Sequence, residues 1–496
     1  MNLRSNVHHC SEKCAIIALA GVLLLSSGCM VGPKYHTPTA PIAAAFKEPP
    51  PAGWKEAQPN DGLLRGKWWE IYNDPQLNAL EEQVSISNQN VLAAEAQFRE
   101  AKAAVRIARS ALFPTVSAAP SIISTRTPSQ VVGSVQGGAS ASPHGFYSLP
   151  FDASYVADLW GNIRRTVTAA TANAQVSAAD LENAKLTFQS ELASDYFQLH
   201  GLDGDAALLS DAVKSYAEFL TLTRNRYNGG VASLGDVAQA ETQLETTRGQ
   251  LVDVGVQRAQ FEHAIAILIG KPPSEFSISS ATLKAPPPVI PVGLPSALLE
   301  RRPDIAANER QVAAANEQIG IAKAAFYPTL TLSASAGFES ADFIKWLSWP
   351  SRFWSVGPQL AETLFDAGKR HAQVSQAEAA YDATVDTYRQ TVLTALQQVE
   401  DNLAALRVLA EEAEVTDRAV KAARQSLDIS TDQYKGGIVA YLQVITAQTA
   451  WLTEQKVAVD LLTRRMTASV SLVEALGGGW DASQLPKAPD IIAANR

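Results

Sequence analysis

The sequence predicts an α+β membrane protein built from two internal structural repeats. The first observation is a pair of similar segments, residues 227–231 (YNGGV) and 434–438 (YKGGI), which lie 207 positions apart. The second is that long segments rich in Ala, Gln and Thr flank both Gly-Gly pairs, a composition that suits long helices packed on small side chains. The third is a stretch of strict period-two alternation that begins at Leu330 and predicts a strand.

Composition excludes several classes of function. The chain has 496 residues and a formal charge of −9, with 41 basic and 50 acidic residues, which disfavours a nucleic-acid binder. The three cysteines, Cys10, Cys14 and Cys29, all lie near the N-terminus, so no disulfide framework holds the body together. The seven histidines are scattered, and neither a metal site nor a cofactor is predicted.

Residues 1–28 are predicted to be a signal peptide. An apolar run at 15–27, preceded by Arg4 and Lys13, is too short to span a bilayer comfortably. The small residues before Cys29 resemble a bacterial lipobox, although Ser26 stands where Leu is usual, and this predicts an acylated Cys29. The alternative is an ordinary signal peptide with an incidental cysteine. Met30 after the cysteine favours the outer membrane, by resemblance to lipoprotein sorting.

The mature chain is predicted to begin with a leader and the first repeat. Residues 29–73 form the leader, with seven prolines between 33 and 59. Residues 74–270 form the first repeat, in which a helix over 74–110 precedes a β-hairpin with a glycine-rich loop around 133–145. A helix of about 100 Å then leads to the first Gly-Gly pair, with a break or slight change in coiling expected near Gly201 and Gly204.

A Pro-rich linker at 271–303 joins this repeat to the second, at 304–476. The second repeat has the same order of helix, two strands, long helix (366–435) and return helix (441–476). Residues 477–496, which begin with three glycines, are predicted to be a mobile tail. Each Gly-Gly pair is predicted to be a turn between two helices, because glycine accepts positive φ at a helix end.

The clearest predicted strand has one apolar and one small polar face. One face carries Leu330, Leu332, Ala334, Ala336 and Phe338, and the other carries Thr331, Ser333, Ser335 and Gly337. We expect the apolar face to contact lipid and the polar face to line a lumen. Four strands per chain are too few to close a barrel, and a bilayer excludes open sheet edges, so several copies are required. Three copies give twelve strands, and assemblies of two or four copies remain possible alternatives.

Several spaced motifs resemble the TolC-like outer membrane factors, in the NodT-type lipoprotein branch that serves tripartite RND-type efflux pumps. These motifs are residues 74–77 (DPQL), 158–161 (DLWG), 164–165 (RR), 294–296 (LPS), 301–304 (RRPD), 326–329 (FYPT) and 364–370 (LFDAGKR), together with both turns. The resemblance covers essentially the whole mature chain. It implies a homotrimer with a twelve-stranded β-barrel, four strands per chain, continued by a long α-helical coiled-coil barrel.

The same resemblance implies a function without chemistry. An outer membrane channel of this type passes drugs or other small molecules to the outside, and is neither an enzyme nor a cofactor protein. It is lipid-anchored in the cell outer membrane and extends into the periplasm. Its implied partners are a periplasmic adaptor (membrane fusion protein), an inner-membrane efflux pump and outer membrane lipid.

The resemblance places a periplasmic gate at the two turns. The expected gate residues are Tyr227, Gly229, Gly230, Asp236, Tyr434, Gly436, Gly437, Leu442, Gln443 and Thr446. Related channels often carry aspartates at the second turn, whereas here Gln443 and Thr446 are uncharged and Asp236 is the carboxylate at the matching position of the first turn. Asp236 could instead be an ordinary helix N-terminal group. Tyr227 and Tyr434 could bond across the turns or only pack there.

The aromatic loop and the chain as a whole each allow another interpretation. Trp346, Trp349 and Trp354 are expected at a membrane interface, or else in a packed loop outside it. The Gly-Lys pairs at 270–271 and 368–369 lack the remaining residues of a phosphate-binding loop, which argues against a nucleotide enzyme. A periplasmic adaptor lipoprotein would have one helical hairpin, not two. The same fold exporting a protein or polymer remains an alternative.

Overall fold

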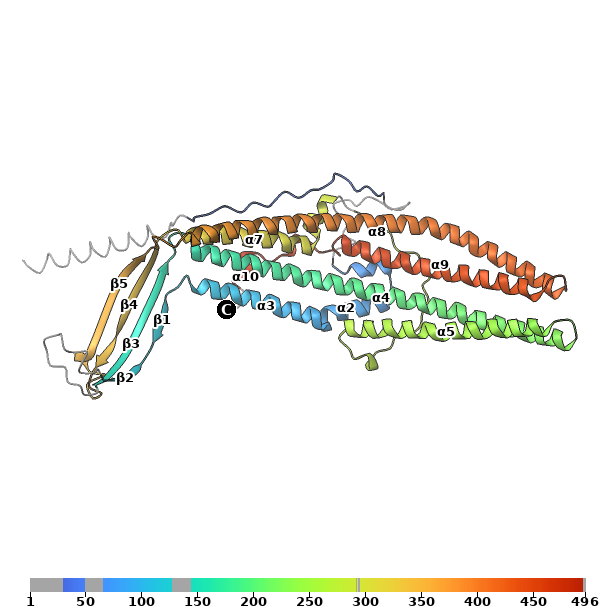
Figure 1. The fold of residues 1–496 in the computed structure, drawn as a ribbon, viewed down its shortest axis with the longest axis horizontal. Helices are drawn as coiled ribbons and strands as arrows, with labels where there is room; N and C mark the ends of the chain where they lie inside the picture. Colours follow the sequence, from blue (N-terminus) through green and yellow to red (C-terminus); the bar gives the residue numbers. More distant parts are fainter. Residues whose placement is uncertain (1–29, 50–65, 127–143, 291, 293–294, 494–496) are drawn as a thin grey trace, which may run out of the picture.

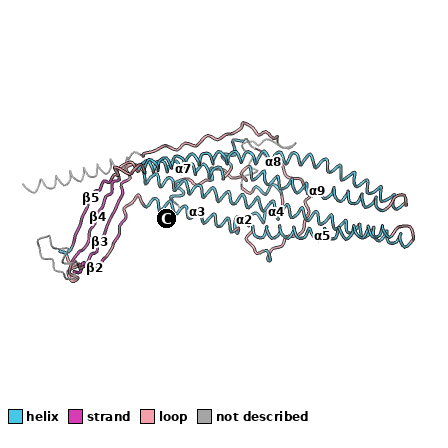
Figure 2. The backbone as a smooth tube through the Cα atoms, in the orientation of Figure 1, coloured by secondary structure: helices cyan, strands magenta, loops and turns pink. Residues whose placement is uncertain are grey.

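The computed structural model describes residues 30–49, 66–126, 144–290, 292 and 295–493. The molecule is elongated, with an antiparallel sheet at one end and helices that run from it to two turns at the opposite end (Figure 1). Figure 2 shows that the long strands occupy only this one end. The predicted signal peptide, Cys29 and most of the predicted glycine-rich loop lie outside the described residues.

The helix predicted over 74–110 is in fact two helices, α2 (Pro75–Ser87) and α3 (Gln89–Ser110). Asn88 separates them with an extended backbone (ψ 122°), and its side-chain oxygen accepts hydrogen bonds from two amides of the first turn of α3. Asparagine is among the best N-cap residues. Its Nδ2 also donates to the carbonyl of Leu268, at 2.8 Å, so a distant segment fixes the break.

The sheet is antiparallel, in the order β1/β2, β3, β4, β5. Its members are β1 (Thr115–Ala118), β2 (Ser121–Thr125), β3 (His144–Ala157), β4 (Thr329–Ser340) and β5 (Arg352–Ala361). Four strands were predicted, and five segments are present because the first strand is interrupted. Ala118 lies opposite Phe151 and Ser121 opposite Ser148, so β1 and β2 share one register on β3. Pro120 lies in the gap, where it has no amide hydrogen to donate.

The register of the sheet separates apolar from polar side chains. Leu332 lies opposite Tyr155 on β3 and Pro358 on β5. One position along β4, Ser333 lies opposite Ser154 and Gly357. Since successive residues of a strand point to opposite faces, the apolar residues of the central strands share one face. The predicted alternation of β4 therefore extends across neighbouring strands.

Two hairpins of long helices form the rest of the body. In the first, α4 (Asn162–Asn228, 67 residues) turns into α5 (Leu234–Leu268, 35 residues). In the second, α8 (Lys369–Lys435, 67 residues) turns into α9 (Tyr441–Ala475, 35 residues). No helix of the described chain is long and apolar enough to cross a membrane.

The break predicted near Gly201 and Gly204 was wrong, because α4 continues through both glycines. Both face α9. A Cβ at Gly201 would lie 2.3 Å from Oγ1 of Thr463, and one at Gly204 would lie 3.1 Å from Cγ1 of Val459. These glycines therefore allow two helices to approach closely, which offsets their low helix propensity.

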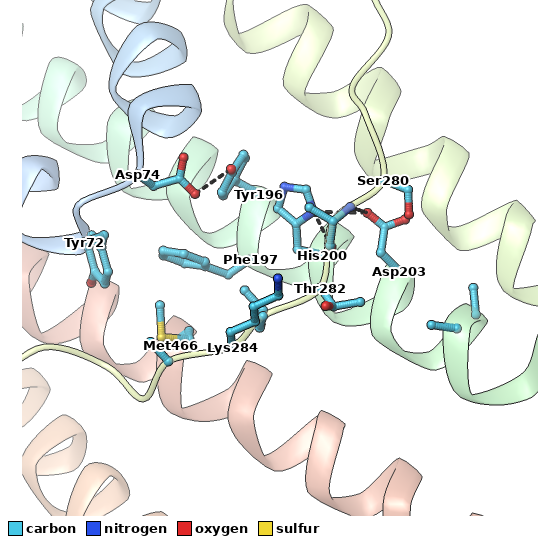
Figure 3. A pocket seen from close by; sticks show the side chains of 15 residues that line it. Tyr72, Asp74, Tyr196, Phe197, His200, Asp203, Ser280, Thr282, Lys284 and Met466 are labelled. Carbon is cyan, nitrogen blue, oxygen red and sulfur yellow. Dashed lines mark hydrogen bonds and ion pairs between the residues drawn. The ribbon is translucent and has the colours of Figure 1, made fainter. Parts of the chain in front are cut away.

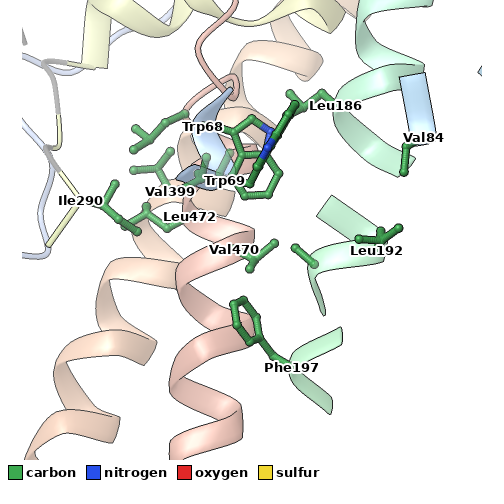
Figure 4. Packing of buried hydrophobic residues seen from close by; sticks show 14 of the residues in the cluster. Trp68, Trp69, Val84, Leu186, Leu192, Phe197, Ile290, Val399, Val470 and Leu472 are labelled. Atoms are coloured by element: carbon green, nitrogen blue, oxygen red, sulfur yellow. The ribbon is translucent and has the colours of Figure 1, made fainter. Parts of the chain in front are cut away.

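The main hydrophobic core lies in the middle of the helical body. Trp68 and Trp69, in the short helix η2 (Trp68–Tyr72), pack between α4 and α9 (Figure 4). Trp68 is 1% exposed and its ring meets that of Trp69 edge to face, with centroids 5.9 Å apart. Burial of such large side chains is a dominant source of stability, at about 25 cal/mol per Å² of apolar surface.

The linker between the two repeats is held by a polar cluster, which we call the linker clasp: the buried His200 and Asp203 with the partly exposed Arg258 and Glu262. Asp203 is 3% exposed and accepts hydrogen bonds from Arg258 Nε (2.7 Å) and from the amide of Ala281 (3.0 Å). His200 Nδ1 lies 2.8 Å from the carbonyl of Ala281 and 3.0 Å from Asp203. Figure 3 shows two of its members, His200 and Asp203, where they line a cavity between the linker, α4 and α9, which has a volume of about 680 Å³.

The short helix α6 (Leu298–Arg301) lies near the end of the linker, and α7 (Pro303–Ala324) then leads to β4. The C-terminal segment, predicted to be mobile, instead packs on the body as far as it is described. Gly477, Gly478 and Gly479 all have positive φ, and a Cβ at Gly478 would lie 2.1 Å from Leu186. The described part of the chain ends in α10 (Ala488–Ala493), where Ile491 is 2% exposed and packs against Val105.

Candidate functional site

The two turns, at the end of the molecule farthest from the sheet, have the same backbone conformation. In the first tip (residues 229–233), the amide of Val231 donates to the carbonyl of Arg226 at 2.8 Å, and Gly230 has φ 74°. In the second tip (residues 436–440), Ile438 donates to Gln433 at 2.9 Å, and Gly437 has φ 76°. Both are Schellman-type helix ends, in which the residue with positive φ is usually glycine.

Arg226 joins the two tips. Its Nη1 donates to the carbonyls of Tyr434 (2.9 Å) and Lys435 (3.4 Å), and its guanidinium lies 4.6 Å from the centroid of the Tyr434 ring. These carbonyls belong to the last turn of α8, where helical carbonyls have no partner within the helix. A cation at a helix C-terminus is also favoured by the helix dipole. Sequence reasoning missed Arg226, whose counterpart in the second repeat is the uncharged Gln433.

Two buried tyrosines pack beneath this contact. Tyr434 is 4% exposed and Tyr441 is 1% exposed, with ring centroids 5.4 Å apart. Thr223 Oγ1 lies 3.4 Å from the Tyr434 hydroxyl. Burial, followed by the nearby Tyr434 and Tyr216, raises the pKa of Tyr441 above its ordinary value. Tyr441 is therefore neutral near pH 7, and the packing of the two rings links the last turn of α8 to the first turn of α9.

Asp236 has a structural role at the start of α5. Its Oδ2 accepts hydrogen bonds from the amide and the hydroxyl of Ser233, while Ser233 Oγ accepts one from the amide of Asp236 at 3.1 Å. This is a capping box, in which two helix-end donors are satisfied reciprocally. The structure therefore confirms the alternative interpretation of Asp236 as a helix N-terminal group. This role is compatible with a carboxylate that also faces a pore.

The remaining predicted tip residues lie on the surface of the single chain. Leu442 is 55% exposed, and Gln443 and Thr446 are exposed beside it. Within one chain, the buried residue at this position is Tyr441, the neighbour of Leu442. Tyr227 is 43% exposed, and Arg226 makes the contact with Tyr434.

The predicted interfacial tryptophans fall into two groups at the far end of the sheet. Trp346 packs in the loop between β4 and β5, with its ring 5.8 Å from Tyr147, and donates to the carbonyl of Phe338 at 3.4 Å. Trp349 and Trp354 are 74% and 77% exposed, and the guanidinium of Arg352 lies 3.8 Å from the ring of Trp349. Only two of the three side chains are therefore free to meet a membrane interface.

Comparisons with known proteins agree with this architecture. The sequence model of the family "Outer membrane efflux protein" matches residues 80–271 and 294–478. The chain is 29% identical to the probable efflux pump outer membrane protein TtgC of Pseudomonas putida, over 94% of this chain and 96% of that protein. It is 28% identical to the pyoverdine export outer membrane protein OpmQ of Pseudomonas aeruginosa, over 94% and 98%.

Solved structures extend the likeness to the fold. The structure of the outer-membrane channel OprN superposes with a TM-score of 0.83 at 28% identity, over 91% of this chain and all of that chain. The outer membrane protein VceC of Vibrio cholerae gives 0.76 at 28% identity, over 84% and 99%. CusC, at 22% identity and a TM-score of 0.81, supports the fold alone. The outer membrane efflux proteins are a family of channels and not of enzymes, and this chain belongs to that family.

Proposed function

We propose that this protein is the outer membrane channel subunit of a tripartite efflux system that passes drugs or other small molecules out of the cell. The observation that carries the proposal is the placement of a sheet with one apolar face at one end and two narrow helical tips at the other. Helices of 67 residues extend about 100 Å, enough to cross much of a periplasm. The names of the relatives, which include toluene and antibiotic efflux pumps, support the substrate class.

We also infer a homotrimer, which the open edges of the sheet support. Within the described chain, β1 and β2 pair only with β3, and β5 pairs only with β4, so both outer edges are open. A bilayer does not tolerate open edges, and pairing of β5 with β1 and β2 of the next copy removes them. Three copies then form a twelve-stranded barrel. The helical hairpins of the same copies continue it as a coiled-coil barrel in the periplasm, in which the two repeats of each chain alternate.

We also propose that Cys29 is acylated and that residues 1–28 are removed. The motive is the small-residue run before Cys29. Cells fed a clickable fatty acid should label the wild-type protein but not Cys29→Ser, and equal labelling of both would contradict acylation. Several acyl chains anchor firmly, because each buried methylene contributes about 0.8 kcal/mol. The substituted protein should still enter the membrane through its strands.

The tips are the proposed periplasmic gate and adaptor-binding end. Exposed apolar side chains at both tips support a partner there, since such clusters mark interaction sites. They are Val231 (69% exposed), Leu234 (64%), Ile438 (76%) and Leu442 (55%). The gate residues remain the predicted set, with Arg226 and Tyr441 added. An inner-membrane pump at the far side of the adaptor would then supply the cargo.

A ring of three Asp236 carboxylates should bind multivalent cations when the pore is narrow. Asp236→Asn should therefore weaken cation block in planar bilayers, but it also disturbs the capping box. Ser233→Ala is the matched control, because it removes the cap hydroxyl, at a cost of about 1 kcal/mol, and keeps the carboxylate. If cation block were lost in both variants, the loss would result from the damaged capping box and not from the missing charge. If Asp236→Asn kept its cation block, Asp236 would not line the constriction.

Dye accumulation tests the proposed function directly. A strain that lacks this protein should accumulate a fluorescent efflux substrate, and a plasmid copy should restore extrusion. Unchanged accumulation of every small-molecule dye, together with loss of a secreted protein or polymer, would instead support the alternative cargo.

A further inference from the structure

The N-terminal leader is not a loose tether in this structure. Residues 30–49 start at the junction between the sheet and the helices and run along α7 and α8 toward the middle of the body (Figure 1). Met30, the first described residue, is 50% exposed and lies directly after the proposed acylation site. Its side chain covers Gly161, where a Cβ would lie 2.3 Å from Cγ of Met30.

Arg165 holds the start of the leader. Its Nε donates to the carbonyl of Val31 (2.7 Å), its Nη2 to that of Pro33 (3.1 Å), and its Nη1 to Oε2 of Glu317 (2.7 Å). Arg165 is 2% exposed and Glu317 is 7% exposed, so the charges neutralise each other in a buried site. The amide of Val31 completes the contact by donating to the carbonyl of Trp160 at 3.1 Å.

The leader could not approach this closely with a larger residue at position 32. Gly32 has φ 110°, and a Cβ there would lie 2.6 Å from Cα of Gly320 on α7. A Cβ at Gly320 would in turn lie 2.3 Å from Nε of Arg165. Gly32, Gly320 and the ion pair of Arg165 with Glu317 therefore form a closely packed site. We call these four residues the leader seat.

The leader seat lies beside an aromatic pair at the base of the central strands. Trp160, just after β3, stacks on Tyr327, just before β4, with ring centroids 4.6 Å apart. Trp160 Nε1 donates to the carbonyl of Pro328 at 2.8 Å. Tryptophan and tyrosine favour the headgroup layer of a membrane. β4 has 12 residues, about 40 Å when extended, which spans a hydrocarbon core when tilted as barrel strands are.

The other end of the leader is also fixed. Glu400 on α8 accepts hydrogen bonds from the amides of Lys47 (2.6 Å) and Glu48 (2.9 Å), and Glu48 pairs with Arg407 at 2.9 Å. Residues 30–49 of the leader are therefore held near both ends of this stretch, and movement at its start would have to break the leader seat.

We propose that the leader seat is a positioning site for the membrane anchor, which delivers the N-terminal acyl chains to the periplasmic leaflet at the level of Trp160 and Tyr327. The inference rests on the proposed insertion of the sheet in the outer membrane. It differs from acylation itself, because the seat places residues 30–33 at the headgroup layer even without acyl chains. Arg165 acts here through the leader backbone, as a positioning residue.

Fluorescence quenching by headgroup-labelled lipid measures this placement. Lys34 is exposed, one residue past the seat, and Lys34→Cys supplies the only free thiol once residues 1–28 are removed and Cys29 is Ser. This variant, exported with a cleavable non-lipoprotein signal peptide, is labelled and placed in phospholipid vesicles that carry a nitroxide on the headgroup. We expect quenching as strong as in the acylated protein.

Gly32→Ala should lose most of this quenching, because the leader can no longer enter its seat. Gly66→Ala is the matched control, since Gly66 also has positive φ (86°) but nothing lies within 4 Å of its added Cβ. Arg165→Lys, which keeps the charge beside Glu317 but not the planar fork, should give an intermediate loss. Weak quenching in the non-acylated protein, or full quenching in Gly32→Ala, would overturn the proposal. Fatty-acid labelling and barrel assembly are measured separately. A protein that assembles normally but is not quenched would contradict the leader seat alone, whereas a protein that does not assemble in the outer membrane would contradict the proposed function.

Discussion

Leu332→Arg should remove most of the assembled protein from outer-membrane fractions, whereas Ser333→Arg should leave much of it. Leu332 lies on the apolar face of β4, opposite Tyr155 and Pro358, as the fourth of the 12 residues of the strand. An arginine that faces lipid costs up to about 2–4 kcal/mol per chain, depending on its depth in the membrane, and a homotrimer carries three. Ser333 lies on the polar face opposite Ser154 and Gly357, which leaves space for a solvated side chain in a lumen.

The two neighbouring substitutions control for each other, because they add the same charge at almost the same depth. The yield of trimer, measured against total expressed protein, is the readout. If Ser333→Arg were the more damaging change, the apolar face would line the lumen and the assignment of the two faces would be reversed.

Asp203→Ala should strongly destabilise the helical body. It removes the nearer of the two carboxylate partners of Arg258, leaving only Glu262 at 3.4 Å, and it removes the acceptor for the amide of Ala281 and for His200. Breaking a buried, hydrogen-bonded charge cluster costs on the order of 3 kcal/mol. Asp211→Ala is the matched control on the same helix, since Asp211 is 77% exposed and its pair with Lys214 should contribute little. Thermal unfolding followed by helical circular dichroism should separate the two variants, and equal midpoints would contradict a stabilising clasp.

The linker clasp also predicts a dependence on pH. Burial opposes ionisation of Asp203, but hydrogen bonds from Arg258, the amide of Ala281 and Ser280 outweigh it and lower the pKa of the carboxyl. A carboxyl with a lowered pKa in the folded state stabilises that state above its ordinary pKa, about 4. The contribution is then lost as the pH falls through the lowered value. The difference in unfolding midpoint between the wild-type protein and Asp203→Ala should therefore be full at neutral pH and shrink below about pH 4.

Local patterns predicted the elements of this fold well. The turn residues and the period-two strand depend on neighbours in sequence, so Gly230, Gly437 and β4 appear where expected. The failures involve partners far along the chain. Asn88 divides a helix with help from the carbonyl of Leu268, and Gly201 accommodates Thr463 instead of breaking α4. Such contacts have no local signature, because a glycine or asparagine in a helix is compatible with several outcomes.

The candidate site was predicted only in part, for the same reason. The duplicated Tyr-x-Gly-Gly motif located both tips and the buried Tyr434. The contact of Arg226 with the last turn of α8 joins residues 208 positions apart and could not be read from either tip alone. The capping box of Ser233 and Asp236 did have a local signal, a serine three residues before a carboxylate at a helix start.

Single-channel recording of Tyr434→Ala tests the central claim, that this protein is a channel closed at its helix tips. Removal of the buried ring takes away the support beneath Arg226 and the packing on Tyr441. Tyr388→Ala is the control, because Tyr388 is a buried tyrosine (3% exposed) of the same helix in the main core. In planar bilayers we expect brief, low-conductance openings for the wild-type protein and for Tyr388→Ala, and long, high-conductance openings for Tyr434→Ala. Identical conductance in all three proteins would contradict closure at the tips.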